Sequence, residues 1–134
     1  DTIRLLAGSS TIGTLLPTAA YYLRMPFQPA RQLIDAGCAI AIATDYNPGS
    51  SPSGNMNLVA SMSCIQLKML PEEVINAGTI NGAFAMEVQD KTGSIRIGKK
   101  ANLIFTKPVP NLAYLFYAFG ATHIDKVMLN GKFL

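Results

Sequence analysis

The chain has 134 residues, a length that one domain with a single core accounts for. Apolar residues make up 49% of it and charged residues only 14%, and this composition excludes intrinsic disorder. No apolar run reaches the roughly 20 residues of a membrane span, and no basic-then-apolar leader opens the sequence, so we expect neither a membrane protein nor a signal peptide.

Charge and cysteine usage narrow the class of protein further. The net charge is +3, and the basic residues are scattered rather than clustered with aromatic side chains, so we expect no nucleic-acid partner. The two cysteines, Cys38 and Cys64, lie in apolar runs without CxxC spacing. This usage predicts buried free thiols in a reducing compartment, the cytoplasm.

The first third of the chain predicts a strand, a helix and a second strand. Residues 1–11 read as the end of a helix and a loop, and 12–16 as a short buried strand that Pro17 closes. Residues 29–37 predict a helix that starts with proline and stops at glycine. The run 38–44 is apolar on both faces, as in a parallel sheet covered by helices, so we expect an α/β fold.

Three helices are predicted in the middle of the chain. The first covers residues 55–69, and its apolar face has helical spacing: Leu58, Val59, Met62 and Ile65. The second begins at Pro71, with two acids in its first turn, and ends near Gly78. The third begins after Thr79 as N-cap and runs to about Val88.

The last third predicts a small β-rich module over residues 93–134. Turns are expected at 92–94 and 98–100, and a strand at 101–106. Residues 127–134 predict a hairpin around Asn130-Gly131, a pair that tolerates positive φ. We therefore divide the chain into a segment 1–92 and a β-rich segment 93–134.

A polar loop after the second strand is the candidate site. Functional groups gather at the carboxyl ends of strands in helix-covered parallel sheets, and Asp45 is the first residue beyond this strand. Its carboxylate can be a metal ligand, a general base or a turn former. Asn47, Gly49 and Ser50 add an amide, a close backbone approach and a hydroxyl, although a polar turn also explains them. The only histidine, His123, is expected to be structural.

Three stretches of the sequence resemble imidazolonepropionases, a family in the metal-dependent amidohydrolase superfamily. They are TLLP at 14–17, ATDYNPGSSP at 43–52 and GSIRIGKKANL at 93–103. The second stretch is the specific one, whereas the third occurs across the superfamily, which usually has aspartate where this chain has Asn102. The resemblance covers the whole chain but only the C-terminal third of the family's enzymes.

The resemblance implies a fold, a reaction and site residues. It implies strands seven and eight of a (β/α)8 barrel in residues 1–92 and part of a small β-sandwich in 93–134. It implies that Asp45 binds zinc or iron(II) and serves in catalysis, and that Asn47, Gly49 and Ser50 bind the substrate. The implied reaction is hydrolysis of 4-imidazolone-5-propanoate to N-formimidoyl-L-glutamate in histidine degradation, by a metal-activated water.

The metal-binding histidines of that family have no counterpart in this chain. We therefore expect a fragment of the enzyme that is inactive alone and that self-associates as a homo-oligomer through orphaned barrel surface. Two alternatives stay open. One is another amidohydrolase that acts on a cyclic amide or amidine, and the other is a non-catalytic structural or oligomerising module.

Overall fold

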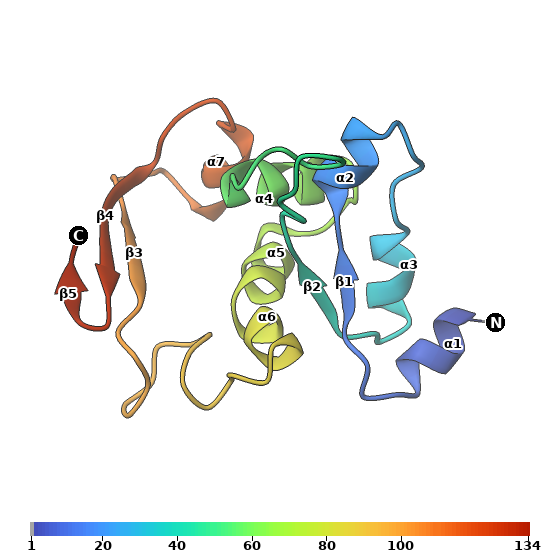
Figure 1. Ribbon diagram of the computed structural model, residues 1–134, viewed down its shortest axis with the longest axis horizontal. Coiled ribbons are helices and arrows are strands. Elements are labelled where there is room, and N and C mark those ends of the chain that lie inside the picture. Colours follow the sequence, from blue (N-terminus) through green and yellow to red (C-terminus); the bar gives the residue numbers. More distant parts are fainter. Residues whose placement is uncertain (1) are drawn as a thin grey trace.

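The computed structural model describes residues 2–134, which form two small sheets with helices packed between and around them (Figure 1). In chain order the elements are α1 (Thr2–Ala7), β1 (Gly13–Leu15), α2 (Pro17–Tyr22), α3 (Ala30–Asp35), β2 (Ile40–Ile42), α4 (Met56–Ile65), α5 (Pro71–Gly78), α6 (Ile80–Ala85), β3 (Leu103–Thr106), α7 (Leu112–Tyr117), β4 (Ile124–Leu129) and β5 (Lys132–Phe133). The α/β class predicted from the sequence is confirmed.

The first sheet is the parallel pair β1–β2, with α3 in the connection between the strands. Gly13 pairs with Ile40 and Leu15 with Ile42. Pro17 follows β1 and opens α2 at its first helical position, where a missing N–H costs nothing. All three residues of β2 are buried, because α5 and α6 also pack against this strand. The predicted strand–helix–strand unit is confirmed, whereas α2 was not predicted.

The second sheet is antiparallel, in the order β3–β4–β5. Asn130 and Gly131 join β4 to β5 with φ of 51° and 81°, which are the positive values of a two-residue hairpin turn. The predicted hairpin is therefore confirmed. Large apolar side chains of this sheet remain exposed, among them Ile104 and Phe133.

The helices of the middle segment depart from the predictions in three details. The helix predicted over residues 55–69 ends at Ile65. The apolar face predicted for α4 is partly wrong, because Ile65 is 58% exposed while Ser61 and Ser63 are buried beside Val59. Small side chains fill this face because α4 packs against α2, α5, α7 and β2. Helix α6 begins directly after Thr79, as predicted, but the Thr79 side chain makes no capping hydrogen bond. Its hydroxyl donates instead to the Ile75 carbonyl of α5, and α6 ends at Ala85 rather than near Val88.

Helix α7 lies inside the segment that was expected to be β-rich. It packs against α4 and α5, and the buried Phe116 joins the same core cluster as Val59 and Val74. The Asn111 side chain caps α7 by accepting a hydrogen bond from the N–H of Tyr114. The chain therefore returns from the second sheet to the helical layer before it forms β4.

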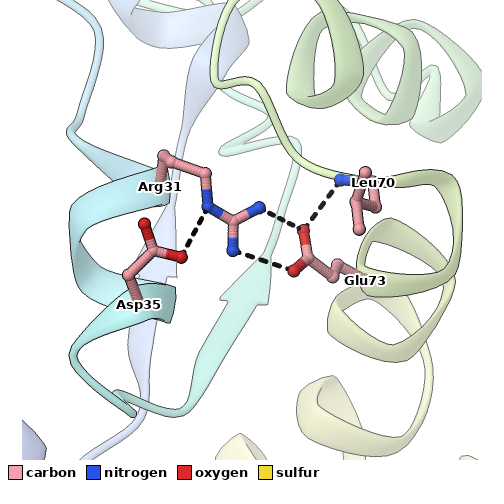
Figure 2. Close-up of polar contacts among 4 residues, drawn as sticks. All are labelled: Arg31, Asp35, Leu70 and Glu73. Carbon is pink, nitrogen blue, oxygen red and sulfur yellow. Dashed lines mark hydrogen bonds and ion pairs between the residues drawn. The ribbon is translucent and has the colours of Figure 1, made fainter.

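A charged cluster joins α3 to α5 (Figure 2). Arg31 donates to both carboxylate oxygens of Glu73, at 3.0 and 2.9 Å, and its Nε donates to Asp35 at 2.9 Å. Glu73 also accepts the N–H of Leu70 at 2.7 Å, which caps α5. The hydrogen bond from Arg31 and the one from Leu70 hold the pKa of Glu73 below its usual value, against an opposing effect of burial. The cluster fixes the helix before β2 against a helix after it.

Candidate functional site

The loop between β2 and α4 carries the predicted site residues, and it begins at the carboxyl end of β2. Asp45 has φ of 51°, in the left-handed region that costs an L-residue about 1–2 kcal/mol. Aspartate is among the side chains that tolerate this region best.

Asn47 holds the loop together with its side-chain amide. Its Nδ2 donates to the Asp45 carbonyl at 2.6 Å and to Ser50 Oγ at 2.8 Å. Its Oδ1 accepts the N–H groups of Gly49 at 2.9 Å and of Ser50 at 2.8 Å. The structure thus brings the four predicted site residues together within one turn. All polar atoms of the Asn47 amide are engaged inside that turn.

The Asp45 carboxylate is half-buried, and one of its oxygens is free to bind. Oδ2 accepts the Ser50 hydroxyl at 3.2 Å. Within residues 2–134, Oδ1 has no hydrogen-bond or ion-pair partner. An anionic oxygen at a strand end is a suitable ligand for a divalent cation.

Two hydroxyl groups outside the four predicted site residues anchor the start of this loop, and of these only Thr18 was not singled out from the sequence. Thr18 Oγ1, in the first turn of α2, donates to the Thr44 carbonyl at 3.0 Å. Ser51 Oγ donates to the same carbonyl at 2.6 Å. The sequence shows a threonine after Pro17 and a second serine in the loop, but only the pairing of β1 with β2 brings Thr18 to the carbonyl that Ser51 also contacts.

The described residues supply one candidate metal ligand rather than a complete site. Within residues 2–134, no three histidine, cysteine, aspartate or glutamate side chains lie close enough to share an ion. Protein metal centres of the zinc type use about three or four protein ligands. Asp45 is therefore one candidate ligand, and a complete centre of this kind would need ligands from outside residues 2–134.

The other reactive side chains lie away from the loop. His123 contacts Tyr114 edge-on, and its Nε2 lies 3.3 Å from the Ala118 carbonyl, which agrees with a structural role. Both cysteines are free, as predicted, but only Cys38 is buried and Cys64 is half-buried. Burial, followed by the carboxylates of Glu72 and Glu73, raises the pKa of the Cys64 thiol to about 11, so this thiol is a poor nucleophile at neutral pH.

Two clefts on the surface do not include the loop. The larger, of about 520 Å³, is lined by α6 and the segment that follows it, including Gln89, Asp90 and Lys99. The smaller, of about 140 Å³, lies between β2, α3 and α5. The candidate site is therefore a partly exposed strand-end loop that lines neither of these two clefts. Among residues 2–134, no helix is both long and apolar enough to cross a bilayer.

Comparison with known families assigns the class of protein. The model of the amidohydrolase family matches residues 1–134, so the chain belongs to the amidohydrolase family.

Within that class the chain is similar to imidazolonepropionases. It is 51% identical over 134 residues to the imidazolonepropionase of Christiangramia forsetii and 50% identical over 134 residues to that of Flavobacterium johnsoniae. Each alignment covers 100% of this chain and 33% of the relative. The imidazolonepropionase of Fusobacterium nucleatum is 47% identical over 130 residues, with 97% of this chain and 31% of the relative covered. The chain thus spans about a third of the length of these curated relatives.

Solved structures share the fold. An adenosine deaminase from Xanthomonas campestris with bound zinc superposes with a TM-score of 0.86 and 26% identity, covering 98% of this chain and 34% of that chain. A guanine deaminase from E. coli superposes with a TM-score of 0.80 and 18% identity, covering 98% of this chain and 35% of that chain. The second likeness bears on fold alone.

Proposed function

We propose that these residues are part of an imidazolonepropionase, which hydrolyses 4-imidazolone-5-propanoate to N-formimidoyl-L-glutamate in histidine degradation. The observation that carries the proposal is the loop from Asp45 to Ser51. Its specific sequence folds into one hydrogen-bonded turn at the carboxyl end of a buried parallel strand, the usual place of catalytic groups in helix-covered sheets. The similarity to curated imidazolonepropionases over the full length of the chain supports the substrate.

The proposed architecture assigns each sheet to a part of a larger enzyme. We take β1 and β2 as strands seven and eight of a (β/α)8 barrel, in a segment 1–92, and β3 to β5 as part of a β-sandwich, in a segment 93–134. Support comes from the parallel pairing across a helical connection and from the exposed apolar side chains of β3 and β5. The rest of the barrel and sandwich, or a second copy of the enzyme in a homo-oligomer, would cover such surfaces.

Asp45 is the proposed metal ligand and catalytic carboxylate. A zinc or iron(II) ion bound there would lower the pKa of a bound water and so supply the attacking hydroxide. The free Oδ1 of Asp45 is the atom that would face the ion, and Oδ2 stays with the Ser50 hydroxyl. The carboxylate can also accept a proton from a neighbouring water.

Asn47, Gly49 and Ser50 are the proposed substrate-binding residues. The Asn47 amide is engaged within the turn, so its part is to shape the backbone that faces the substrate. Gly49 is exposed, and a Cβ at this position would lie 3.4 Å from Asn47 Oδ1. The absence of a side chain leaves the turn open to a ligand. The Ser50 hydroxyl contacts both Asn47 and Asp45, and a hydroxyl can donate one hydrogen bond while it accepts another from a ligand.

The test is Asp45→Asn in a full-length enzyme that carries these residues. The substitution keeps the shape of the side chain and removes its negative charge. We expect turnover to fall by at least ~100-fold, because a general base or metal ligand contributes that much or more, while the thermal midpoint of the metal-free enzyme stays unchanged. Turnover above about a tenth of the parent rate, on that scale, would contradict the proposal.

A substrate panel separates this proposal from its nearest alternative. If the full-length enzyme turned over another cyclic amide or amidine and left 4-imidazolone-5-propanoate untouched, the substrate assignment would be wrong and the amidohydrolase chemistry would stand. Absence of turnover and of metal in the full-length protein would instead favour a structural or oligomerising module. We place the enzyme in the cytoplasm, in keeping with its two free cysteines.

A further inference from the structure

Two buried hydroxyl groups meet on a single backbone carbonyl next to Asp45. Thr18 Oγ1 and Ser51 Oγ donate to the Thr44 oxygen at 3.0 and 2.6 Å. The two residues are 5% and 1% exposed, respectively. A carbonyl oxygen has two lone pairs, so these two bonds saturate it.

The two donors belong to different parts of the fold, so they hold the Thr44–Asp45 peptide from two sides. Thr18 lies in the first turn of α2, the helix that follows strand β1, 26 residues before Thr44. Ser51 stands where the loop returns, and its backbone pairs with Asn47. The peptide between Thr44 and Asp45 is therefore fixed both to the adjacent strand and to the far end of the loop.

The peptide on the other side of Asp45 is held as well. The Asp45 carbonyl accepts Asn47 Nδ2 at 2.6 Å, and Asp45 itself adopts a sparsely populated left-handed conformation. A residue in this conformation persists only where its surroundings determine it. The hydroxyls of Thr18 and Ser51 are the part of those surroundings that holds the carbonyl before Asp45.

We propose that Thr18 and Ser51 are positioning residues, whose hydroxyls jointly orient the Thr44–Asp45 peptide and so aim the Asp45 carboxylate at its metal. This inference rests on the proposed role of Asp45. Neither residue touches the carboxylate, so each acts through the backbone. Outer contacts that orient a metal ligand are worth about 10- to 100-fold in metal affinity or activity.

The experiment uses the full-length enzyme with three variants. Thr18→Val and Ser51→Ala each remove one hydroxyl at nearly constant volume, and Thr18→Ser keeps it. The readouts are the zinc dissociation constant, measured by competition with a chromogenic chelator, the separate values of kcat and KM, and the thermal midpoint of the metal-free protein. We expect Thr18→Val and Ser51→Ala to weaken zinc binding and to lower kcat by about 10-fold or more each, with KM little changed, and Thr18→Ser to restore both.

Ser63→Ala is the matched control. Ser63 is 0% exposed, and its hydroxyl also donates to a backbone carbonyl, that of Val59 within α4, at 2.8 Å. This substitution removes a buried hydrogen bond without touching the loop. We expect it to lower the thermal midpoint while zinc affinity and kcat stay at parent values. If Ser51→Ala does not fold, the Thr18→Val and Thr18→Ser pair decides alone.

Asp45→Asn separates failure of this inference from failure of the proposed function. If Asp45→Asn weakens zinc binding but Thr18→Val and Ser51→Ala do not, the positioning role is overturned and the role of Asp45 stands. If Asp45→Asn leaves zinc affinity unchanged, the proposed function itself fails. In the Asp45→Asn background we expect Thr18→Val to have no further effect on zinc affinity, because both changes act on one ligand. Full additivity would overturn the positioning role.

Discussion

Replacement of Gly93 by alanine tests the turn that closes against α6. Gly93 has φ of 86°, and an added Cβ would lie 2.4 Å from the Cβ of Ala83 and 3.1 Å from the carbonyl oxygen of Thr79. Non-bonded carbons rest about 3.5–4.0 Å apart, so the overlap exceeds what a rotamer change can relieve. Neither atom can move by a side-chain rotation, because one is the carbonyl oxygen of the residue before α6 and the other is the Cβ of a residue inside α6. The turn or the helix must therefore move.

The expected cost has a conformational part and a packing part. An alanine at positive φ destabilises the folded state by about 1–2 kcal/mol. Alanine also lowers the conformational entropy of the unfolded chain, which offsets about 0.4–1 kcal/mol of this cost. Overpacking of a well-packed contact adds about 1–3 kcal/mol. We expect Gly93→Ala to lower the free energy of unfolding by about 3 kcal/mol in total, a large share of the roughly 5–15 kcal/mol of a typical domain.

Gly98→Ala is the matched control for the conformational part. Gly98 has φ of 90°, and a Cβ there meets nothing within 4 Å. This variant should lose only about 1 kcal/mol. With a urea m-value of ~2 kcal/mol/M, the unfolding midpoints should fall by about 1.5 M for Gly93→Ala and about 0.5 M for Gly98→Ala, with unchanged m-values.

A second substitution checks that the contact with Ala83 is responsible. Ala83→Gly removes the atom at 2.4 Å, at the ordinary cost of a glycine inside a helix, about 1 kcal/mol. We expect the double variant to be more stable than the sum of the two single effects predicts. Equal midpoints for Gly93→Ala and Gly98→Ala, or strict additivity with Ala83→Gly, would refute the reasoning.

Three further outcomes follow from the site and its surroundings. The Cys64 thiol, with a pKa raised to about 11, should react with iodoacetamide at pH 8 about 100-fold more slowly than an unperturbed thiol. The contribution of this protonated thiol to the free energy of unfolding is present below the pKa of the thiol in the unfolded chain and should be lost as pH rises through its pKa in the folded chain. Glu73→Gln should lower the urea midpoint at pH 7 more than Glu72→Gln, its exposed neighbour. That difference should shrink as pH falls through the depressed pKa of Glu73, because the stability that Arg31 gives this carboxylate exists only while it is ionised. The isolated chain should hold no stoichiometric zinc after chelator washing, since Asp45 stands alone among residues 2–134, and elemental analysis that finds one ion per chain would contradict this.

The parts of the fold that follow local rules could be predicted from the sequence. Pro17 and Gly78 mark element boundaries, and Asn130-Gly131 marks the hairpin, because backbone geometry at such residues is decided within a few positions. Buried and exposed sides of α4 could not be predicted in this way. Ile65 is exposed and Ser63 buried because the helix is surrounded by four other elements, and close packing there selects small side chains over apolar ones.

In the candidate site, too, the local contacts could be predicted from the sequence and the contact between distant segments could not. Asp45 was found because a strand end and a specific loop sequence point to it, and the contacts of Asn47 stay within the turn. Thr18 was missed because its contact with the Thr44 carbonyl exists only once β1 and β2 are paired, and Ser51 was noted only as a hydroxyl of the loop, without its partner. Hydrogen bonds between residues far apart in sequence leave no local pattern.

The packing of α7 on α4 has a consequence for how this chain can be recombined with those of its relatives. Between β3 and β4 the chain travels to the helical layer and back, and it leaves Phe116 buried there, 5% exposed. A chimaera joined at residue 92, with the small sheet borrowed from a relative that lacks this excursion, would leave the place of Phe116 vacant. Truncation of a buried phenylalanine costs about 3–5 kcal/mol. Exchange of the C-terminal segment therefore succeeds only where the donor carries its own version of α7.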